Sequence, residues 1–391
     1  MNHAVIIAAS RTPVGSFQGS LSGLAAPKLG AIAIKESLKR AQLKAEEIDE
    51  VIMGEVLTAG VGQAPARQSA LYAGIANSVR CMTINKVCGS GLKAVMLAAD
   101  SVNLGHSQFV IAGGQENMSL APHLMENSRV GYRMGPQTIS DSMVKDGLWD
   151  PYNNFHMGNA AELCVREYKF TREEQDAFAI DSYKKAQNAI QSGAFKNEIA
   201  AVEIQDRKGT IRIENDEEPG NAKFDKIPGL RPAFEKEGTI TAANASKIND
   251  GAAALVVTTE ALAKQRGSKV LAKIKAQATF AQDPKWFTTA PVGAMKEALK
   301  KANLTVDQID LWEINEAFAN VTMAAIRDLK IDPARVNING GAVAIGHPIG
   351  ASGARILTTL LYALEAKNKK YGMASLCIGG GEAVAVIVER P

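Results

Sequence analysis

The strongest constraint on the fold is that the sequence repeats itself. Residues 37–43 match residues 298–304 in order and in residue type, and the correspondence continues downstream in the same register. A further match, at nearly the same offset, joins residues 89–91 (Gly-Ser-Gly) to residues 351–353 (Ala-Ser-Gly). Several matching windows in one register indicate an internal duplication rather than a chance likeness.

The local pattern within each copy predicts an α/β unit. Apolar residues recur at helical spacing at Ile34, Leu38 and Ala41, and at the corresponding positions of the second copy. Each of these helices is followed by a short apolar run that is typical of a strand. Because helix and strand signals alternate in the same order in both copies, we predict a duplicated α/β fold with largely parallel sheets.

A segment of different character, residues 119–248, separates the two copies. It contains a capping box, Thr171-x-x-Glu174, which predicts the start of a helix. Residues 202–213 are typical of a hairpin, with the turn at Lys208-Gly209. Because this segment interrupts the repeat, we interpret it as a substrate-binding lid or a subunit contact added to the duplicated core.

These boundaries predict three domains. The first half comprises residues 1–118 and is completed by residues 249–270, which include the last strand of that half. Residues 119–248 form the inserted domain, and residues 271–391 form the second half.

Composition excludes several classes of function. The 44 basic residues nearly balance the 41 acidic residues, so no nucleic-acid surface is indicated. No apolar stretch is long enough to span a bilayer, so no membrane partner is expected. Four cysteines in a chain of 391 residues do not form a disulfide framework, which favours a reducing compartment and a cytoplasmic location.

Three reactive side chains lie in glycine-rich segments and suggest covalent thiol chemistry. Cys88 immediately precedes a Gly-Ser-Gly sequence and a strong helix, and a helix N-terminus is expected to lower the pKa of its thiol. His347, one of five histidines, stands in a glycine-rich turn and is placed to accept the thiol proton. Cys377 precedes three glycines, whose N–H groups are candidates to hold an oxyanion.

Other interpretations of these residues stay open on the sequence alone. Cys88 is also consistent with a small buried side chain that caps a helix, and His347 with a structural histidine. Asn315, at the end of a predicted strand, is typical of a helix cap. A redox pair of Cys88 with Cys377 is less consistent with the sequence, since such pairs are usually close along the chain, and an acid/base role fits Cys377 better.

Four segments in this order resemble the thiolase family over essentially the whole chain. They are Asn85-Lys86-Val87-Cys88-Gly89-Ser90-Gly91, Asn315-Glu316-Ala317-Phe318, the glycine-rich run at 340–348 that contains His347, and Cys377-Ile378-Gly379-Gly380-Gly381. The resemblance implies the thiolase fold, in which two similar α/β halves pack as five αβαβα layers and a loop domain is inserted into the first half.

The resemblance also implies catalytic roles. Cys88 would be the nucleophile that becomes acylated, and His347 would activate it. Cys377 would be the acid/base that removes a proton from the α-carbon of the second acyl-CoA. One oxyanion hole would use His347 and a water held by Asn315, and the other would use the N–H groups of Cys88 and Gly379. A decarboxylating relative of the fold needs no such base, so Cys377 favours a thiolase.

Coenzyme A contacts follow from the same resemblance. Ser246 would contact the pantetheine in a loop at 242–246, and a lysine such as Lys226 would meet the 3′-phosphate, where some relatives have arginine. The other expected tunnel residues are Leu148, His156, Met157, Ala233, Phe234 and Phe318. The chain departs from the usual pattern at Trp286-Phe287, which is expected to reshape the acyl pocket, and at Glu382, close to Cys377.

The expected activity is that of a short-chain, biosynthetic-type thiolase. It would condense two acetyl-CoA molecules to acetoacetyl-CoA and CoA through an acyl-Cys88 intermediate, and catalyse the reverse thiolysis, with CoA thioesters as substrates and no permanently bound cofactor or metal. The alternatives are a broad or long-chain 3-ketoacyl-CoA thiolase of β-oxidation, a catalytically silent acyl-CoA carrier, and an unrelated cysteine hydrolase. Such thiolases resemble one another in their assembly, so a homotetramer (a dimer of dimers) with residues 119–145 at its contact is expected.

Overall fold

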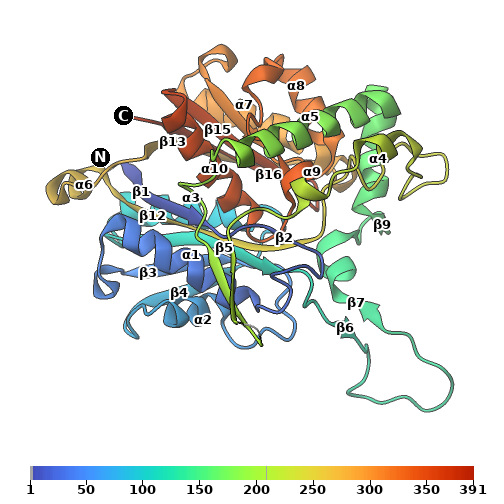
Figure 1. Cartoon of the computed structure of the whole chain (residues 1–391), viewed down its shortest axis with the longest axis horizontal. Coiled ribbons are helices and arrows are strands. Elements are labelled where there is room, and N and C mark those ends of the chain that lie inside the picture. The colour runs from blue at the N-terminus through green and yellow to red at the C-terminus, as the bar shows by residue number, and fades with distance from the viewer. Residues whose placement is uncertain (1–2, 208) are drawn as a thin grey trace.

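The computed structural model describes residues 3–207 and 209–391. Two sets of strands follow the same spatial order, which confirms the predicted duplication (Figure 1). In the first half the order is β1 (Ala4–Arg11), β12 (Asn249–Thr259), β5 (Val110–Asn117), β3 (Glu50–Gly54) and β4 (Arg80–Ile84). In the second half the order is β13 (Ala272–Ala281), β16 (Glu382–Glu389), β15 (Tyr371–Ile378) and β14 (Leu311–Ile314). Edge strands β1 and β13 pair at two positions and join the two sets into one sheet.

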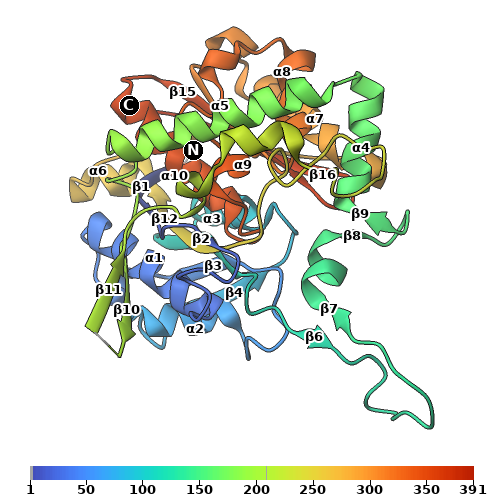
Figure 2. The ribbon, with the colours of Figure 1, turned by 45° about the vertical axis from the view of Figure 1, so that its right-hand side comes forward.

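Helices divide the molecule into five layers, as expected for the thiolase fold. The helices that enclose the sheet are α1 (Ala26–Ala41), α2 (Pro65–Tyr72), α3 (Ser90–Asn103), α7 (Ala290–Ala302), α8 (Ala319–Leu329) and α10 (Ser352–Ala366). Helices α3 and α10 share one apolar core with strands of both halves and so form the central layer. Helices α1 and α2 cover the outer face of the first half, and α7 and α8 that of the second (Figures 1 and 2).

The central helices approach each other closely at their first turns. A Cβ atom on Gly353 would lie 2.4 Å from the main-chain nitrogen of Leu92, and one on Gly91 would lie 2.8 Å from that of Ala354. Only glycine permits two backbones to pack at this separation. The contact therefore brings together the two helix starts that carry the conspicuous Cys88 and His347 segments.

The expectation of largely parallel sheets is wrong. Parallel pairing is confined to β3 with β4 and β5, and to β14 with β15, whereas the remaining pairs of the large sheet are antiparallel. The reason lies in the connections. Strand β12 returns from the inserted segment in the opposite direction to β5, and β15 and β16 are joined directly by the short turn at Gly379–Gly381, which only an antiparallel pair allows.

The inserted segment contains two long helices and several short hairpins. Its elements are β6 (His123–Leu124), β7 (Ser140–Asp141), a π-helical turn η2 (Met143–Leu148), β8 (Trp149–Asp150), β9 (Phe155–His156), α4 (Met157–Tyr168), α5 (Arg172–Gln191), β10 (Val202–Asp206), β11 (Gly209–Ile213), and the 3-10 turns η3 (Glu218–Asn221) and η4 (Phe224–Gly229). The predicted capping box at Thr171 and Glu174 is confirmed. The predicted hairpin is confirmed in β10 and β11, while Lys208 of its turn lies outside the described residues. The three domain boundaries stay a prediction.

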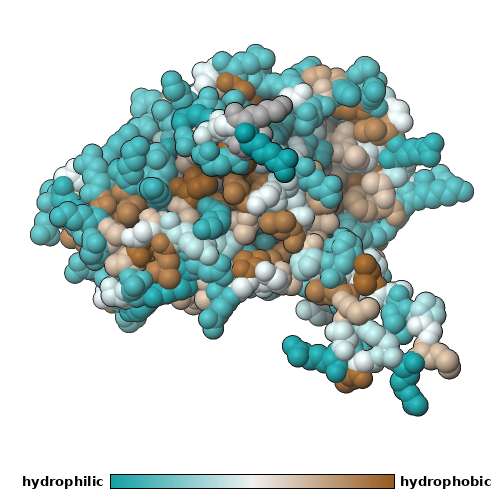
Figure 3. Space-filling view, turned by 60° about the horizontal axis from the view of Figure 1, so that its bottom comes forward, coloured by the Kyte–Doolittle hydropathy of each residue, from teal (hydrophilic) through white to brown (hydrophobic). Residues whose placement is uncertain are grey.

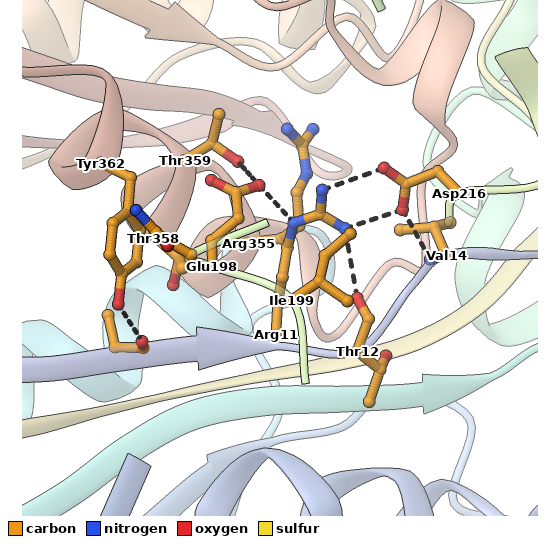
Figure 4. Close-up of polar contacts among 12 residues, drawn as sticks. Arg11, Thr12, Val14, Glu198, Ile199, Asp216, Arg355, Thr358, Thr359 and Tyr362 are labelled. Atoms are coloured by element: carbon orange, nitrogen blue, oxygen red, sulfur yellow. Dashed lines mark hydrogen bonds and ion pairs between the residues drawn. The ribbon is translucent and has the colours of Figure 1, made fainter. Parts of the chain in front are cut away.

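Arg11 fastens the inserted segment to the core (Figure 4). Its guanidinium is fully buried at the end of β1 and bonds Glu198 Oε1 at 2.6 Å and both carboxylate oxygens of Asp216 at 2.7 and 2.9 Å. Asp216 also accepts the N–H of Val14. Removing one partner of such a buried pair typically costs about 3–5 kcal/mol, so this cluster fixes the path of the chain on both sides of the hairpin.

An extended arm leaves the body of the molecule between β6 and β7 (Figures 1 and 3). It exposes several large apolar side chains: Met125, Val130, Met134 and Ile139. Exposed apolar side chains grouped on one projection are typical of an interaction surface. Within residues 3–207 and 209–391, no helix combines the length and apolar character needed to cross a membrane.

Candidate active site

Cys88 lies in a strained turn at the start of α3. Val87 has a φ of 45°, which is unfavourable for a β-branched residue and is found where the surroundings hold the chain firmly. Here the N–H of Val87 donates to Asn85 Oδ1 at 2.9 Å, and the hydroxyl of Ser90 donates to Val87 O at 2.7 Å. The Ser90 hydroxyl also accepts the N–H of Lys86 at 2.8 Å. These bonds hold the thiol at the helix start.

The expected lowering of the Cys88 pKa is wrong. Burial raises the pKa of the Cys88 thiol to about 11, although the main-chain N–H groups of Gly379 and of Cys88 itself act in the opposite direction. The helix terminus was a reasonable signal, but the thiol also lies against the apolar layer between the two halves, and removal from water disfavours the charged form more strongly. Cys88 is therefore a neutral thiol at rest, with two N–H groups directed at its sulfur.

His347 lies in the turn between α9 (Ala342–Ile345) and α10, and its neighbours fix both its position and its tautomer. Its main-chain N–H donates to Asn249 Oδ1 at 2.9 Å. The Ser352 hydroxyl donates to Pro348 O at 2.8 Å, so its oxygen must accept the 2.5 Å bond from the imidazole Nδ1. The proton is thereby assigned to Nδ1, and Nε2 keeps a free lone pair.

His347 is neutral as well as oriented. Burial, together with the positive charge of Arg355, lowers the pKa of His347 to about 3. At neutral pH the pair is thus a thiol and an imidazole, not a preformed thiolate–imidazolium pair.

Two buried carboxylates secure the loop that carries His347. Glu116, at the end of β5, accepts the N–H groups of Val56, Leu57 and Gly350 at 3.1, 3.1 and 2.8 Å. On the other side of His347, Glu316 accepts the N–H of Val343 at 3.1 Å. Both halves of the molecule therefore hold this loop.

Sequence reasoning missed most of these supporting residues. Asn249, Ser352 and Glu116 were not among the predicted site residues. The only signal for Ser352 was its correspondence with Ser90 in the repeat, since both open a central helix. Asn249 and Glu116 act from strands that are distant in sequence, so the sequence offered no sign that they contact the His347 loop.

Asn315 and Cys377 approach the same place from the second half. Asn315 Nδ2 lies 3.5 Å from His347 Nε2 and both side chains are buried, so the amide faces the free lone pair. Cys377, at the end of β15, is fully buried beside Met157 and Phe318. Burial raises the pKa of the Cys377 thiol, and the nearby Cys88 raises it further. The two thiols are thus close enough to interact electrostatically.

A cavity of about 210 Å³ lies against Cys88 and His347. Most of the predicted residues line it: Cys88, Leu148, His156, Met157, Phe234, Ser246, Phe318, His347 and Gly379. The cavity is also lined by Met118, Lys247 and Phe287. Most of its lining residues are apolar.

Other predicted residues lie outside this cavity. Cys377 and Asn315 are behind its wall, Ala233 precedes the lining residue Phe234, and Lys226 belongs to an outer cavity that shares Lys247 with the inner one. Trp286 lines neither of these cavities and borders a separate surface hollow, so of this pair only Phe287 lines the inner cavity.

His156 acts partly as a structural residue. Its Nδ1 accepts the N–H of Gly158 at 3.0 Å and so caps α4, while its ring stacks on Phe234 at 4.9 Å between centroids. Phe234 in turn meets Phe318 edge to face. Burial lowers the pKa of His156, so it stays neutral. The three rings form a rigid apolar wall.

Glu382 forms an ion pair with Lys86. Lys86 precedes the Cys88 turn and Glu382 follows the Gly379–Gly381 turn, so the pair links the two catalytic loops at their outer edge. Among residues 3–207 and 209–391, no group of three or more His, Cys, Asp or Glu side chains is arranged to hold a metal ion.

Comparison with known proteins agrees with this geometry. The family model described as "Thiolase, N-terminal domain" matches residues 4–261, and that described as "Thiolase, C-terminal domain" matches residues 268–390. The acetyl-CoA acetyltransferases of Cupriavidus necator and Pseudomonas aeruginosa are 54% and 50% identical to this chain, with full coverage of both proteins in each case.

A solved structure agrees in three dimensions. The crystal structure of the Bacillus anthracis acetyl-CoA acetyltransferase superimposes with a TM-score of 0.98 at 39% identity, covering 100% of this chain and 99% of that one. Family matches over both halves, full-length relatives and the shared fold lead to one conclusion: the chain belongs to the thiolase family.

Proposed function

We propose that this protein is an acetyl-CoA acetyltransferase that condenses two acetyl-CoA molecules to acetoacetyl-CoA and CoA, and catalyses the reverse thiolysis. One observation carries the proposal. A single cavity presents the Cys88 thiol, a neutral His347 and the N–H groups of Cys88 and Gly379, while Cys377 lies directly behind it. The names of the full-length relatives support the same activity.

The first half-reaction transfers an acetyl group to Cys88. The sulfur attacks the thioester carbonyl while its proton passes to His347 Nε2, and the N–H groups of Cys88 and Gly379 stabilise the developing oxyanion. The C–S bond to CoA then breaks, and the Cys377 thiol supplies the proton with which CoA leaves. Acetyl-Cys88, a Cys377 thiolate and an imidazolium remain.

The second half-reaction forms the carbon–carbon bond. The Cys377 thiolate takes an α-proton from a second acetyl-CoA, and its raised pKa makes it a strong enough base for this weak acid. The imidazolium and the Asn315 side chain stabilise the enolate oxygen. The enolate attacks acetyl-Cys88, and the departing Cys88 sulfur regains its proton from His347, so that every group returns to its starting state.

Coenzyme A would lie along the inner and outer cavities. Ser246, Leu148 and the wall of His156, Phe234 and Phe318 would flank the pantetheine, since all of them line the inner cavity. Lys223 and Lys226 line the outer cavity beside Lys247, and their charges suit the phosphates. Ala233 contributes by its backbone, whose N–H donates to Ile240 O at 2.8 Å and holds Phe234 in place.

The short-chain preference is supported by the bulky side chains that pack around Cys377. Phe287 is buried and lies in one apolar cluster with Met157, Phe318 and Cys377, so bulky side chains surround the reacting carbon. Nothing in this cluster favours the long-chain 3-ketoacyl-CoA alternative. The catalytically silent carrier and the simple cysteine hydrolase are less consistent with two facing thiols.

The deciding test is CoA-dependent cleavage of acetoacetyl-CoA, compared with a long-chain 3-ketoacyl-CoA by kcat/KM. We expect a strong preference for acetoacetyl-CoA. Equal or faster cleavage of the long chain would move the protein to β-oxidation, and absence of cleavage would favour the carrier. In the Cys377→Ala variant, mass spectrometry should still find acetyl-Cys88 while condensation is lost. A variant that keeps full turnover would contradict the role of Cys377.

We also propose that the protein is a homotetramer in the cytoplasm. The exposed apolar side chains of the arm support the contact predicted in residues 119–145, and the four free cysteines suit a reducing compartment. Light scattering on the native chain and on a chain shortened between β6 and β7 would test the assembly, since the proposal requires the shortened chain to form a smaller particle.

A further inference from the structure

Lys247 is a half-buried lysine that the proposed mechanism does not use. Its ammonium donates hydrogen bonds to two main-chain carbonyl oxygens, Ala245 O at 2.9 Å and Val343 O at 3.2 Å. The ring of Tyr183 lies beside it, with its centroid 5.5 Å from Nζ. The carboxylates that act on it, Glu218 and Glu316, do so through space. Its direct partners are therefore backbone carbonyls and an aromatic face rather than an anion.

The two carbonyls belong to two loops of the active site. Ala245 precedes Ser246, which lines the inner cavity, and the N–H of Ser246 donates to Ala317 O at 2.9 Å. Val343 lies in α9, immediately before the turn that carries His347. The ammonium thus bridges the segment expected to hold the pantetheine and the segment that presents the catalytic imidazole.

The N–H and the carbonyl of Val343 are both held by side chains. Glu316 accepts the N–H of Val343 at 3.1 Å, and Lys247 donates to its carbonyl at 3.2 Å. Burial lowers the pKa of Lys247 to about 8, and the charges of Glu218 and Glu316 oppose this effect. A lysine side chain is kept in such a place only where its bonds are needed to satisfy the surrounding carbonyls.

We propose that Lys247 is a positioning residue, whose ammonium cross-links the Ser246 loop to α9 and thereby sets the distance between the bound thioester and His347. This inference rests on the proposed function. Lys247 would keep the Ser246 loop and the His347 imidazole at a fixed separation. Such a reaction is sensitive to misplacement of its groups.

A competing role for Lys247 is direct contact with a CoA phosphate, because it also lines the outer cavity with Lys223 and Lys226. The two roles differ in their dependence on the substrate. A phosphate contact matters only for a substrate that carries phosphates. A cross-link between the loops matters equally for acetoacetyl-CoA and for acetoacetyl-pantetheine, which lacks the nucleotide and its phosphates.

The experiment measures kcat and KM for CoA-dependent cleavage of acetoacetyl-CoA, and for pantetheine-dependent cleavage of acetoacetyl-pantetheine, in native protein and in Lys247→Ala and Lys247→Met. We expect kcat/KM to fall about 10- to 100-fold for both substrates, mainly through kcat. Methylamine should restore part of the activity of Lys247→Ala, because it can place an ammonium between the same carbonyls, and should not help Lys247→Met. The matched control is Lys301→Met, which removes a lysine bonded to Gln277 O far from the site and should leave both rates unchanged.

Three results would overturn the inference. If the Lys247 variants lose activity only with acetoacetyl-CoA, Lys247 contacts a phosphate. If their rates are unchanged with both substrates, Lys247 has no role in the reaction. Loss with both substrates, a lowered Tm and no rescue by methylamine would make it only structural. If native protein cleaves neither substrate, the proposed function fails instead, which distinguishes the two failures.

Discussion

Each half of the molecule contributes a helix to the site, and the two helices begin with an equivalent serine. The two serines hold different groups. In the first half, the Ser90 hydroxyl donates to Val87 O and accepts the N–H of Lys86, which holds the turn that presents Cys88. In the second half, the equivalent Ser352 donates to Pro348 O and accepts from the imidazole of His347. One serine therefore holds a strained backbone, and the other holds a catalytic side chain.

The difference extends to the reactive positions themselves. In the repeat, Cys88 corresponds to Gly350 and His347 corresponds to Asn85. A side chain at Gly350 is excluded, because its Cβ would lie 2.7 Å from Glu116 Oε2 and 2.8 Å from Gln115 O. The second half cannot carry its own thiol there. Duplication thus supplies two equivalent helix starts, and packing at their contact leaves room for one thiol and one imidazole.

The strongest test of this comparison replaces His347 with asparagine, the residue found at the corresponding position of the first half, Asn85. His347→Asn keeps a group that can bond Ser352 but has no basic nitrogen to accept the Cys88 proton. Because an amide is far less basic than an imidazole, we expect steady-state turnover, and the rate at which acetyl-CoA acetylates Cys88, to fall about a thousandfold. The rates are followed by CoA release and by rapid-quench mass spectrometry.

The control for this variant is His106→Asn, which changes an exposed histidine outside the site and should leave both rates as they are. If His347→Asn acetylated Cys88 at the native rate, the imidazole would not be the base. The asymmetry between the two halves would then have to lie elsewhere.

The resting charge of the pair is tested by alkylation of Cys88 at different pH values. With the pKa of Cys88 near 11 and that of His347 near 3, the reactive thiolate is scarce at neutral pH and rises about tenfold for each pH unit. Iodoacetamide labelling of the Cys88 peptide should therefore accelerate about a thousandfold between pH 7 and pH 10. A labelling rate that does not rise with pH above pH 7 would show that Cys88 and His347 already form an ion pair. The reactive group of each half would then be charged before substrate binds.

The architecture and the reactive residues could be predicted from the sequence because each leaves a local pattern. The matched windows gave the duplication, and the glycines beside Cys88, His347 and Cys377 marked places where backbones and substrate approach closely. Most of the predicted tunnel residues do line the cavity with Cys88 and His347. Their roles in binding and catalysis stay a prediction.

The rest depends on contacts that only the folded chain creates. The direction of the Cys88 pKa was misjudged because the helix terminus is visible in the sequence, whereas the apolar layer that buries the thiol is assembled from both halves. Asn249 and Lys247 form hydrogen bonds with the His347 loop from segments about a hundred residues away, so no local sequence motif indicates their role. Strand direction was misjudged because the path of the inserted segment back to β12 cannot be read from periodicity.

A smaller effect is expected when the serine of the second half is removed. Ser352→Ala leaves the Nδ1 proton without its partner, while Pro348 O keeps its bonds from the N–H groups of residues 351 and 352, so the imidazole can turn or change tautomer. We expect kcat to fall about tenfold, with little change in KM, because substrate contacts stay in place. Turnover with acetoacetyl-CoA at saturating CoA measures this. A variant with native kcat would mean that Asn249 and the loop alone orient His347.

The smallest effect on rate is expected for the matching change in the first half. Ser90→Ala removes the bonds to Lys86 N and Val87 O, but Asn85 still holds Val87, and the Lys86–Glu382 ion pair still links the turn to the Gly379–Gly381 turn. The lost bonds should lower the free energy of unfolding by about 1–3 kcal/mol and reduce kcat only about two- to threefold. Thermal unfolding and turnover of both serine variants, measured side by side, decide the matter. If Ser90→Ala lost more turnover than Ser352→Ala, the strained turn at Val87 would be the more demanding part of the site, and the proposed division between a structural serine and a catalytic one would be reversed.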